Sequence, residues 1–192
     1  GGRWSGAGEV GSGIADRDDC AAAGAGAAVL RMAVRLRRLS GKTIAWAREH
    51  FRRNLNETPA GAQARAYALQ RGLSAETIEA CGLGFAVDAW DDIVNAARRR
   101  GVRPELLQQA GLTASNERGR VYDRFRNRLI FPITDALGRP IAFGGRTLGD
   151  DPAKYLNSPE TPLFSKSRVL YGLDRARDEI RKQDSVIVVE GY

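Results

Sequence analysis

The sequence has few of the residues that build zinc clusters and disulfide frameworks. Its 192 residues include two cysteines, Cys20 and Cys81, and a single histidine, His50. A structural zinc site takes four Cys or His ligands, and a disulfide framework needs several cysteines at suitable spacings, so the sequence predicts neither. We expect the two thiols to be structural. We expect His50 to be a surface or packing residue rather than a metal ligand.

Long apolar runs are also lacking. No run approaches the ~18 apolar residues of a membrane-spanning helix, so we expect no membrane partner. The sequence starts at Gly1, and no charged segment leads into an apolar signal stretch. We therefore expect no secretory signal and a cytoplasmic location, and we interpret the sequence as a fragment of a longer chain.

Charge of both signs is plentiful, with an excess of positive charge. Lys and Arg total 30 against 23 Asp and Glu, which gives a net charge of +7. This excess favours an anionic partner, and nucleic acid is the usual one. Most of the cations are arginines, whose planar guanidinium suits phosphate. Composition alone leaves open a basic face that meets only solvent.

The first 40 residues are rich in Gly and Ala, and we expect residues 1–40 to be disordered. Two segments here imitate nucleotide-binding motifs. In "GAGAAV", Val29 stands where a dinucleotide fingerprint needs its third small residue. Before "SGKT", Leu36 stands where a phosphate loop needs its first glycine. The sequence therefore predicts no nucleotide-triphosphatase loop.

Short helices are predicted between residues 44 and 111. One apolar face has helical spacing and consists of Ile44, Ala47, Phe51 and Leu55. Ser74 is predicted to cap one later helix and Asp88 another, which ends at Arg98–Arg100. Pro104 opens a last helix before Gly111.

An extended segment follows residue 116. Arg124, Arg126 and Arg128 recur at period two, so a strand would direct all three guanidinium groups to one face. We expect a hairpin of strands 129–133 and 141–143, joined by "DALG" with Gly138 at positive φ. The arginine row suits a phosphate-binding surface or, equally, a solvated edge strand protected by charge.

The next segment combines several groups that suit nucleic acid. Gly144 and Gly145 permit close approach of a ligand directly before Arg146. The segment after them supplies two cations, an aromatic ring and an amide: Lys154, Lys166, Tyr155 and Asn157.

The last residues, "SVIVVEGY", predict a buried strand that ends at a carboxylate. Val186–Val189 form a continuous β-branched run, typical of a strand inside a parallel sheet. Glu190 and Gly191 would lie at the carboxyl end of this strand, where open α/β sheets bind ligands. We therefore expect the sequence to stop inside an active site.

Four segments together resemble the RNA polymerase core of bacterial DnaG-type primases. They are "RGLSAETIEACGLGFAVDAW", "YDRFRNRLIFPITDALGRPIAFGGR", "KYLNSPETPLFSKSRVLYGL" and "VVEGY". They occur in the family's order within about residues 43–192, and residues 1–40 show no such resemblance. The resemblance implies an α+β fold with a basic amino-terminal subdomain over 41–166. It also implies that a truncated α/β Toprim subdomain starts at 167 and continues to 192 with its first strand.

The resemblance also implies roles for individual residues. A groove for single-stranded template and RNA:DNA product would be lined by Arg71, Arg124, Arg126, Arg146, Lys154, Tyr155, Asn157 and Lys166. Within this set, Lys154 and Lys166 would contact triphosphate or template phosphates. Glu190 would be the Toprim glutamate, a catalytic metal ligand beside Mg²⁺ or Mn²⁺.

Other Toprim carboxylates, the family's zinc module and its helicase-docking region have no counterpart in the 192 residues. Two metal ions need several carboxylates, and Glu190 is one. We therefore expect the full protein to make short RNA primers from ribonucleoside triphosphates, as a replisome partner of the replicative helicase, and this chain to be inactive. The alternative is a non-catalytic fragment that binds single-stranded nucleic acid. Another Toprim protein, such as a topoisomerase, would share only "VVEGY".

Overall fold

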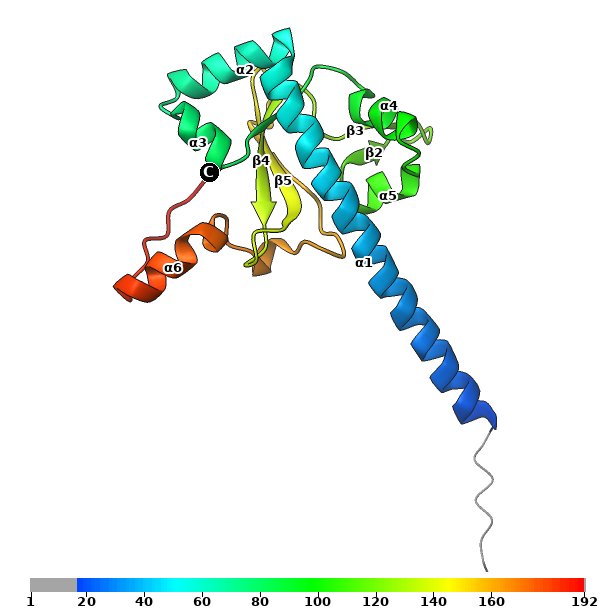
Figure 1. Cartoon of the computed structure of the whole chain (residues 1–192). Coiled ribbons are helices and arrows are strands. Elements are labelled where there is room, and N and C mark those ends of the chain that lie inside the picture. The colour runs from blue at the N-terminus through cyan, green and yellow to red at the C-terminus, as the bar shows by residue number, and fades with distance from the viewer. Residues whose placement is uncertain (1–16, 192) are drawn as a thin grey trace, which may run out of the picture. The chain divides into compact units, whose positions relative to one another are not determined.

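The computed structural model describes the backbone of residues 17–191 and the side chains of residues 27–191. It divides into two units, residues 1–36 and residues 37–192. In the described part, the first unit holds the start of helix α1 (Arg17–Glu57), and the second unit holds the other elements (Figure 1).

Helix α1 corrects the expectation of disorder for residues 17–40, the described part of the segment 1–40. Residues 17–40 are helical, and residues 1–16 lie outside the described residues. The reason is local, because this stretch is rich in Ala, Leu, Arg and Val and contains no proline to interrupt a helix. Both "GAGAAV" and "SGKT" lie inside α1. Their helical state agrees with the prediction that neither forms a nucleotide-binding loop.

Five further helices lie in the second unit. They are α2 (Pro59–Gln70), α3 (Ala75–Ala80), α4 (Asp92–Arg99), α5 (Pro104–Gln109) and α6 (Leu173–Gln183), with a 3₁₀ turn η1 (Lys166–Arg168). The Ser74 hydroxyl caps α3 by accepting a hydrogen bond from the backbone N–H of Thr77 at 3.1 Å, which confirms that prediction. Pro104 is the first residue of α5, also as predicted.

The start of α4 differs from the prediction. The helix begins at Asp92, and its N-cap is Asp91 rather than Asp88. Asp91 makes no capping hydrogen bond with its side chain. Instead, the carboxylate of Asp123 accepts the backbone N–H groups of Ile93 and Val94, at 2.7 and 3.2 Å. A local cap was therefore not required, because a residue distant in the sequence satisfies the first-turn donors.

The main sheet is antiparallel and has the strand order β1-β4-β5-β6. Its strands are β1 (Gly84–Ala86), β4 (Arg128–Thr134), β5 (Pro140–Thr147) and β6 (Tyr155–Asn157), while β2 (Thr113–Ser115) and β3 (Val121–Asp123) form a separate pair. The predicted hairpin is confirmed as β4 and β5. At its turn, Gly138 has φ +76°, and Asp135 Oδ1 accepts the backbone N–H groups of Leu137 and Arg139.

The two faces of this sheet pack against different helices. On one face, Ile130 and Phe143 pack in a cluster that includes Ile44, Ala47 and Phe51 of α1, together with side chains of α4 and α5. On the other face, a cluster joins the end of α1, residues of α2 and α3, and strand residues: Leu55, Ala64, Ala68, Ile78, Leu129 and Phe131. Figure 1 shows α2 and α3 on one side of β4 and β5, and α4 and α5 on the other. The predicted apolar face of α1 is therefore confirmed, because all four of its residues are buried.

The segment after α6 contradicts the prediction for Val186–Val189. These residues form no strand, and their side chains are exposed. Among the described residues, no strand pairs with them, and an apolar run without a partner strand gains neither ladder hydrogen bonds nor burial. In the part of the chain that the structure describes, no helix has the length and apolarity to cross a membrane.

Candidate functional site

The row of three arginines predicted on one strand is divided between two structural settings. Arg124 and Arg126 lie in the connection between β3 and β4, and only Arg128 lies in a strand. The prediction of one extended strand was wrong because Asn127 adopts φ +47°, which interrupts the period-two alternation.

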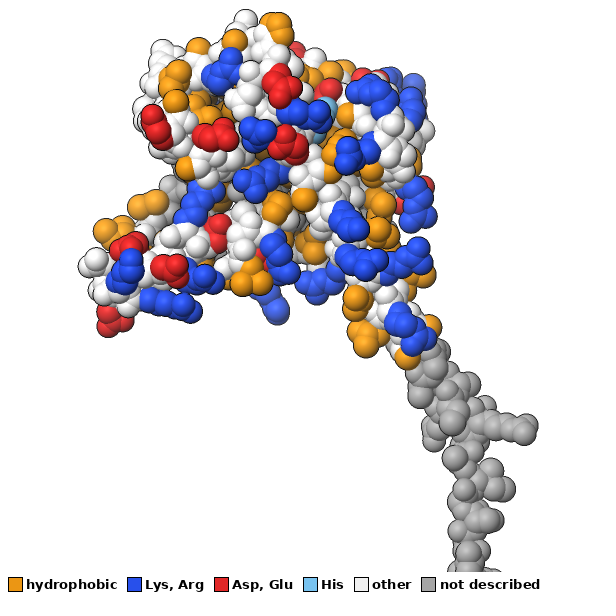
Figure 2. Space-filling view, in the orientation of Figure 1, with side chains coloured by type: hydrophobic (Ala, Val, Ile, Leu, Met, Phe, Trp, Pro, Cys, Tyr) orange, Lys and Arg blue, Asp and Glu red, His pale blue; other side chains and the backbone are white. Residues whose placement is uncertain are grey.

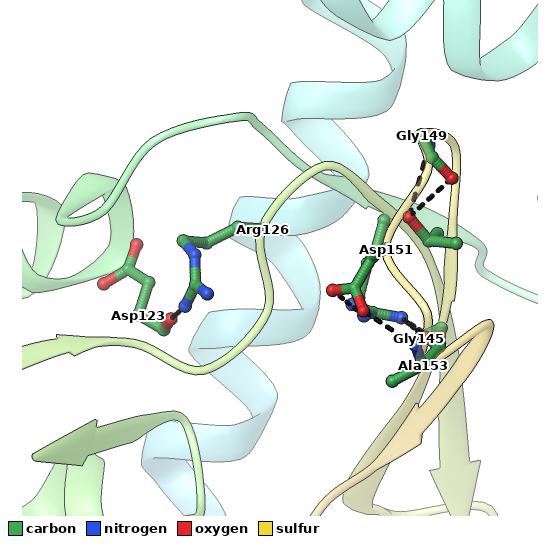
Figure 3. A network of polar contacts seen from close by, with 8 residues as sticks. Asp123, Arg126, Gly145, Gly149, Asp151 and Ala153 are labelled. Atoms are coloured by element: carbon green, nitrogen blue, oxygen red, sulfur yellow. Dashed lines mark hydrogen bonds and ion pairs between the residues drawn. The ribbon is translucent and has the colours of Figure 1, made fainter. Parts of the chain in front are cut away.

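Arg128 is a structural residue. Its side chain is 2% exposed, and its Nη2 lies 2.6 Å from Asp151 Oδ2. Its Nη1 donates to the carbonyl oxygen of Ala153 at 2.9 Å and to that of Gly145 at 3.3 Å (Figure 3). A buried guanidinium is tolerated because these acceptors replace water. Arg128 therefore holds the 149–153 loop against β5.

Arg126 lies on an aromatic surface that we call the Trp90 platform, formed by Trp90, Tyr122 and Arg126. The guanidinium carbon is 4.1 Å from the centroid of the Trp90 ring and 5.3 Å from that of Tyr122. The two rings meet edge to face at 5.5 Å. Trp90 is nevertheless 60% exposed. An exposed indole beside a cation can stack a nucleobase and attract its phosphate.

Asp123 connects this platform to α4. Its carboxylate caps α4, its backbone N–H donates to the carbonyl oxygen of Trp90 at 2.8 Å, and its own carbonyl accepts from Arg126 Nη1 (Figure 3). Burial raises the pKa of Asp123 to about 6, against the lowering effect of the backbone hydrogen bonds from Ile93 and Val94. The nearby carboxylates of Asp92 and Asp91 raise it further.

Arg124 lies near the edge of the main sheet. Its Nε and Nη2 donate to the carbonyl oxygen of Asn157 in β6 at 3.4 and 3.3 Å, and burial lowers the pKa of Arg124. Arg124 and Arg126 line the same cleft of about 220 Å³, together with Asp151 and Leu156. The structure therefore brings all three arginines of the predicted row to this cleft, although not from a single strand.

A second set of predicted residues meets on the opposite face of the sheet. Cross-strand pairing aligns Leu129, Arg146 and Tyr155, so their side chains share one face. Arg146 Nε donates to the Tyr67 hydroxyl of α2, and its Nη1 donates to the Tyr155 hydroxyl. The hydrogen bond to Tyr67 is the main reason why the pKa of Arg146 is raised.

Arg71 follows α2. It lines the same pocket as Tyr67, Arg146 and Tyr155, and this pocket has a volume of about 330 Å³. We call Tyr67, Arg71, Arg146 and Tyr155 the arginine–tyrosine cluster. In this cluster, the guanidinium carbon of Arg146 lies 5.1 Å from the ring centroid of Tyr155 and 5.8 Å from that of Tyr67. The two phenols hold this cation in place before any ligand arrives, which lowers the entropic cost of binding.

The remaining predicted residues lie outside these two clusters. Lys154 is exposed directly before β6, and its carbonyl accepts the backbone N–H of Thr147 at 3.0 Å. Lys166 is exposed in η1, where its backbone N–H donates to Glu160 Oε1 at 2.9 Å. Glu190 is exposed in the segment after α6.

A divalent metal site does not fit the residues described. Between residues 27 and 191, no three Asp, Glu, His or Cys side chains gather so that they could hold a metal ion. Glu190 contributes one carboxylate, whereas two-metal chemistry needs several.

The sequence analysis missed Tyr67, Trp90 and Tyr122. Tyr67 precedes Arg71 by one helical turn, so a shared helix face was a usable signal. Trp90 had no such signal, because its contact with Arg126 depends on the fold that brings residues 90 and 126 together.

Comparison with known proteins identifies the family. The family model for the DNA primase catalytic core, N-terminal domain, matches residues 50–177. The chain belongs to this family. The match confirms the resemblance inferred from the sequence.

The DNA primase of Deinococcus radiodurans is 54% identical over 127 residues, which cover 66% of this chain and 22% of that protein. The chain thus spans about a quarter or less of the curated DNA primases it matches, from 22% to 25%.

Solved primase structures share the fold. A DnaG primase catalytic domain bound to ssDNA has a TM-score of 0.74 and 41% identity, and the match covers 83% of this chain and 49% of that one. The RNA polymerase domain of Mycobacterium tuberculosis primase DnaG, in complex with a double-stranded DNA oligomer with a 6-nucleotide overhang, has a TM-score of 0.75 and 37% identity. That match covers 81% of this chain and 49% of the other. The mixed α+β fold of a primase catalytic core is therefore confirmed.

Proposed function

We propose that this chain is the part of a DNA primase that binds single-stranded template. The observation that carries the proposal is the likeness, over 83% of the chain, to a DnaG catalytic domain bound to ssDNA. Two basic, aromatic surfaces support it, namely the Trp90 platform and the arginine–tyrosine cluster. Each combines guanidinium groups for phosphates with rings on which bases stack, as single-strand binding requires.

Within this proposal, each predicted residue has a role. Arg146 and Arg71 neutralise phosphates at the arginine–tyrosine cluster, and Tyr155 positions a nucleotide there. Arg124 and Arg126 contact the backbone of the template or of the RNA:DNA product. Asn157 supplies polar contacts, while Lys154 and Lys166, both exposed, bind triphosphate or template phosphates.

For the full protein, we propose synthesis of short RNA primers on single-stranded DNA in the bacterial cytoplasm. Ribonucleoside triphosphates would be the substrates, Mg²⁺ or Mn²⁺ would stabilise the reacting phosphates, and the replicative helicase would be a partner. A Toprim subdomain would begin near residue 167, with Glu190 as one metal ligand. Because the described residues form no carboxylate cluster, we expect the 192-residue chain alone to be inactive. The family match favours this proposal over a non-catalytic binding protein.

Binding of a fluorescent single-stranded DNA, measured by anisotropy at several salt concentrations, tests the proposal. The logarithm of the affinity should fall linearly with the logarithm of salt, with a slope of about −0.7 per neutralised phosphate. The double variant Arg146→Ala with Lys154→Ala should bind more weakly and have a slope smaller by about 1.4.

The matched control is Arg181→Ala with Lys182→Ala, which removes the same charge from exposed positions of α6. Affinity should change little in this variant. If both double variants bind and respond to salt like the unmodified chain, the role of Arg146 and Lys154 is refuted. Templated dinucleotide synthesis by the purified chain with Mg²⁺ or Mn²⁺ would refute its expected inactivity.

A further inference from the structure

A third polar groove lies between the second half of α1 and the end of α4. Its volume is about 460 Å³, and its walls include Trp46, His50, Arg53, Asn54, Arg99 and Arg100. It shares none of its residues with the Trp90 platform or the arginine–tyrosine cluster. Figure 2 shows the histidine in pale blue, beside basic side chains in blue.

The floor of the groove has a fixed hydrogen-bonding pattern. His50 and Asn54 are each 8% exposed, and both contact Asp92 Oδ2, with His50 Nε2 at 2.7 Å and Asn54 Nδ2 at 3.0 Å. Burial raises the pKa of Asp92, but the hydrogen bonds from His50 and Asn54 outweigh this effect and hold the pKa below its ordinary value. Asp92 is therefore a carboxylate that only accepts hydrogen bonds.

This carboxylate determines which atoms face the groove as acceptors. His50 must carry its proton on Nε2, and Asn54 must direct its NH₂ group to Asp92. In a singly protonated imidazole, Nδ1 is then an acceptor, as is Oδ1 of Asn54. Neither atom has a hydrogen-bond partner among the described residues. A ligand that satisfies them must offer N–H or O–H donors.

The wall and rim of the groove supply two other kinds of contact. The ring of Trp46 is partly buried, with its centroid 5.8 Å from that of His50, so it presents a flat aromatic wall. Arg53, Arg99 and Arg100 are exposed at the rim, against the single carboxylate of Glu57. With the Asp92 carboxylate of the floor included, three cations and two anions leave a net charge of +1, which favours a phosphate group.

We propose that this groove binds a nucleotide whose base carries an exocyclic amino group, namely adenine, cytosine or guanine. The two N–H groups of the amino group donate to His50 Nδ1 and Asn54 Oδ1, the base lies against Trp46, and the phosphates pair with the rim arginines. Uracil and thymine offer one N–H donor, at N3, so they leave one of the two acceptors unsatisfied, which costs binding energy. The groove volume lies within the range of small-molecule sites.

Calorimetric titration of the 192-residue chain with ATP, UTP and inorganic triphosphate tests the proposal. ATP should bind at least about tenfold more tightly than UTP, because one unsatisfied buried acceptor corresponds to about 1–3 kcal/mol. Inorganic triphosphate should bind more weakly than ATP. Equal affinity for ATP and UTP, or for ATP and triphosphate, would overturn the proposal and leave only a basic patch.

Two kinds of variant locate the binding. Arg99→Gln with Arg100→Gln changes only exposed residues and should weaken ATP binding at least about tenfold. His50→Phe keeps an aromatic ring in place but removes one acceptor, so it should abolish the preference for ATP over UTP. A preference that survives in His50→Phe would refute the role given to that residue.

Lys154→Ala with Lys166→Ala separates this inference from the proposed template site. If that variant loses ATP binding while Arg99→Gln with Arg100→Gln retains it, the nucleotide binds at the template residues. The inference about the groove is then refuted, whereas the proposed template site is not. If the groove is confirmed, competition between ATP and oligo(dA) assigns it to a base within a strand. Absence of competition assigns it to a free nucleotide.

Discussion

The carboxyl group of Asp123 should reveal itself in the pH dependence of folding. Burial raises its pKa to about 6 in the folded chain, whereas an aspartate in an unfolded chain has a pKa of about 3.9. The folded state therefore holds this proton at pH values where the unfolded state has lost it. The associated stability is fully present below about pH 4 and is lost as the pH rises through about 6.

The size of this effect follows from the shift. About two pKa units correspond to about 3 kcal/mol, at 1.36 kcal/mol per unit. The side chain of the variant Asp123→Asn cannot ionise, so the variant does not lose this stability as the pH rises. Its free energy of unfolding, relative to that of the unmodified chain, should rise by about 2 kcal/mol between about pH 4 and about pH 7, since part of the full effect develops below pH 4. At low pH the two proteins should still differ in free energy of unfolding. In Asp123→Asn the amide NH₂ group, which cannot accept a hydrogen bond, must face one of the N–H donors of Ile93 and Val94.

Urea unfolding followed by far-UV circular dichroism measures this difference. Curves for both proteins are collected at matched ionic strength from about pH 4 to about pH 7. Carboxylates with lowered pKa, such as Asp92 and Asp135, titrate in both proteins, so their contributions largely cancel in the difference. The control is Asp88→Asn, which removes an exposed carboxylate before α4.

A constant difference between Asp123→Asn and the unmodified chain across this pH range would refute the reasoning. That result would mean that solvent, or the hydrogen bonds from Ile93 and Val94, offsets the effect of burial on the pKa of Asp123.

Two further predictions concern packing. Gly61→Ala should destabilise the chain by about 3 kcal/mol or more, because the new Cβ would lie 2.1 Å from the carbonyl oxygen of Asn54. The control is Gly41→Ala in α1, where the new Cβ meets no atom within 4 Å. This substitution should stabilise the chain by about 0.5–1 kcal/mol. Equal effects of the two substitutions in urea unfolding would contradict this reasoning. Phe143→Ala should cost about 3–5 kcal/mol, because this ring is fully buried against two other aromatic rings, and a midpoint shift in thermal unfolding below about 4 °C would contradict it.

Local signals in the sequence predicted much of the fold. The spacing of Ile44, Ala47, Phe51 and Leu55 identified the buried face of α1, because helical periodicity depends only on neighbouring turns. The cap at Ser74 and the β4–β5 turn are equally local. Family resemblance then predicted the primase core, which the family match confirms.

Features that depend on distant residues escaped the sequence analysis. Asp123 caps a helix that begins about 30 residues earlier, so no local pattern marked its role. Trp90 meets Arg126 only after folding, and the positive φ of Asn127 that divides the arginine row carries no warning in its neighbours. For Val186–Val189 the local signal was present but the distant partner was not. Their β-branched side chains favour a strand, but no described strand pairs with them.

The position of β6 at the edge of the main sheet determines the path of any bound strand. Arg146 and Tyr155 lie on one face of this edge, whereas Arg124 reaches Asn157 from the cleft on the other. A DNA strand that contacts both sets must therefore cross the margin of the sheet at β6. Short oligonucleotides would occupy one face at a time, and affinity would increase abruptly at the length that first spans the margin.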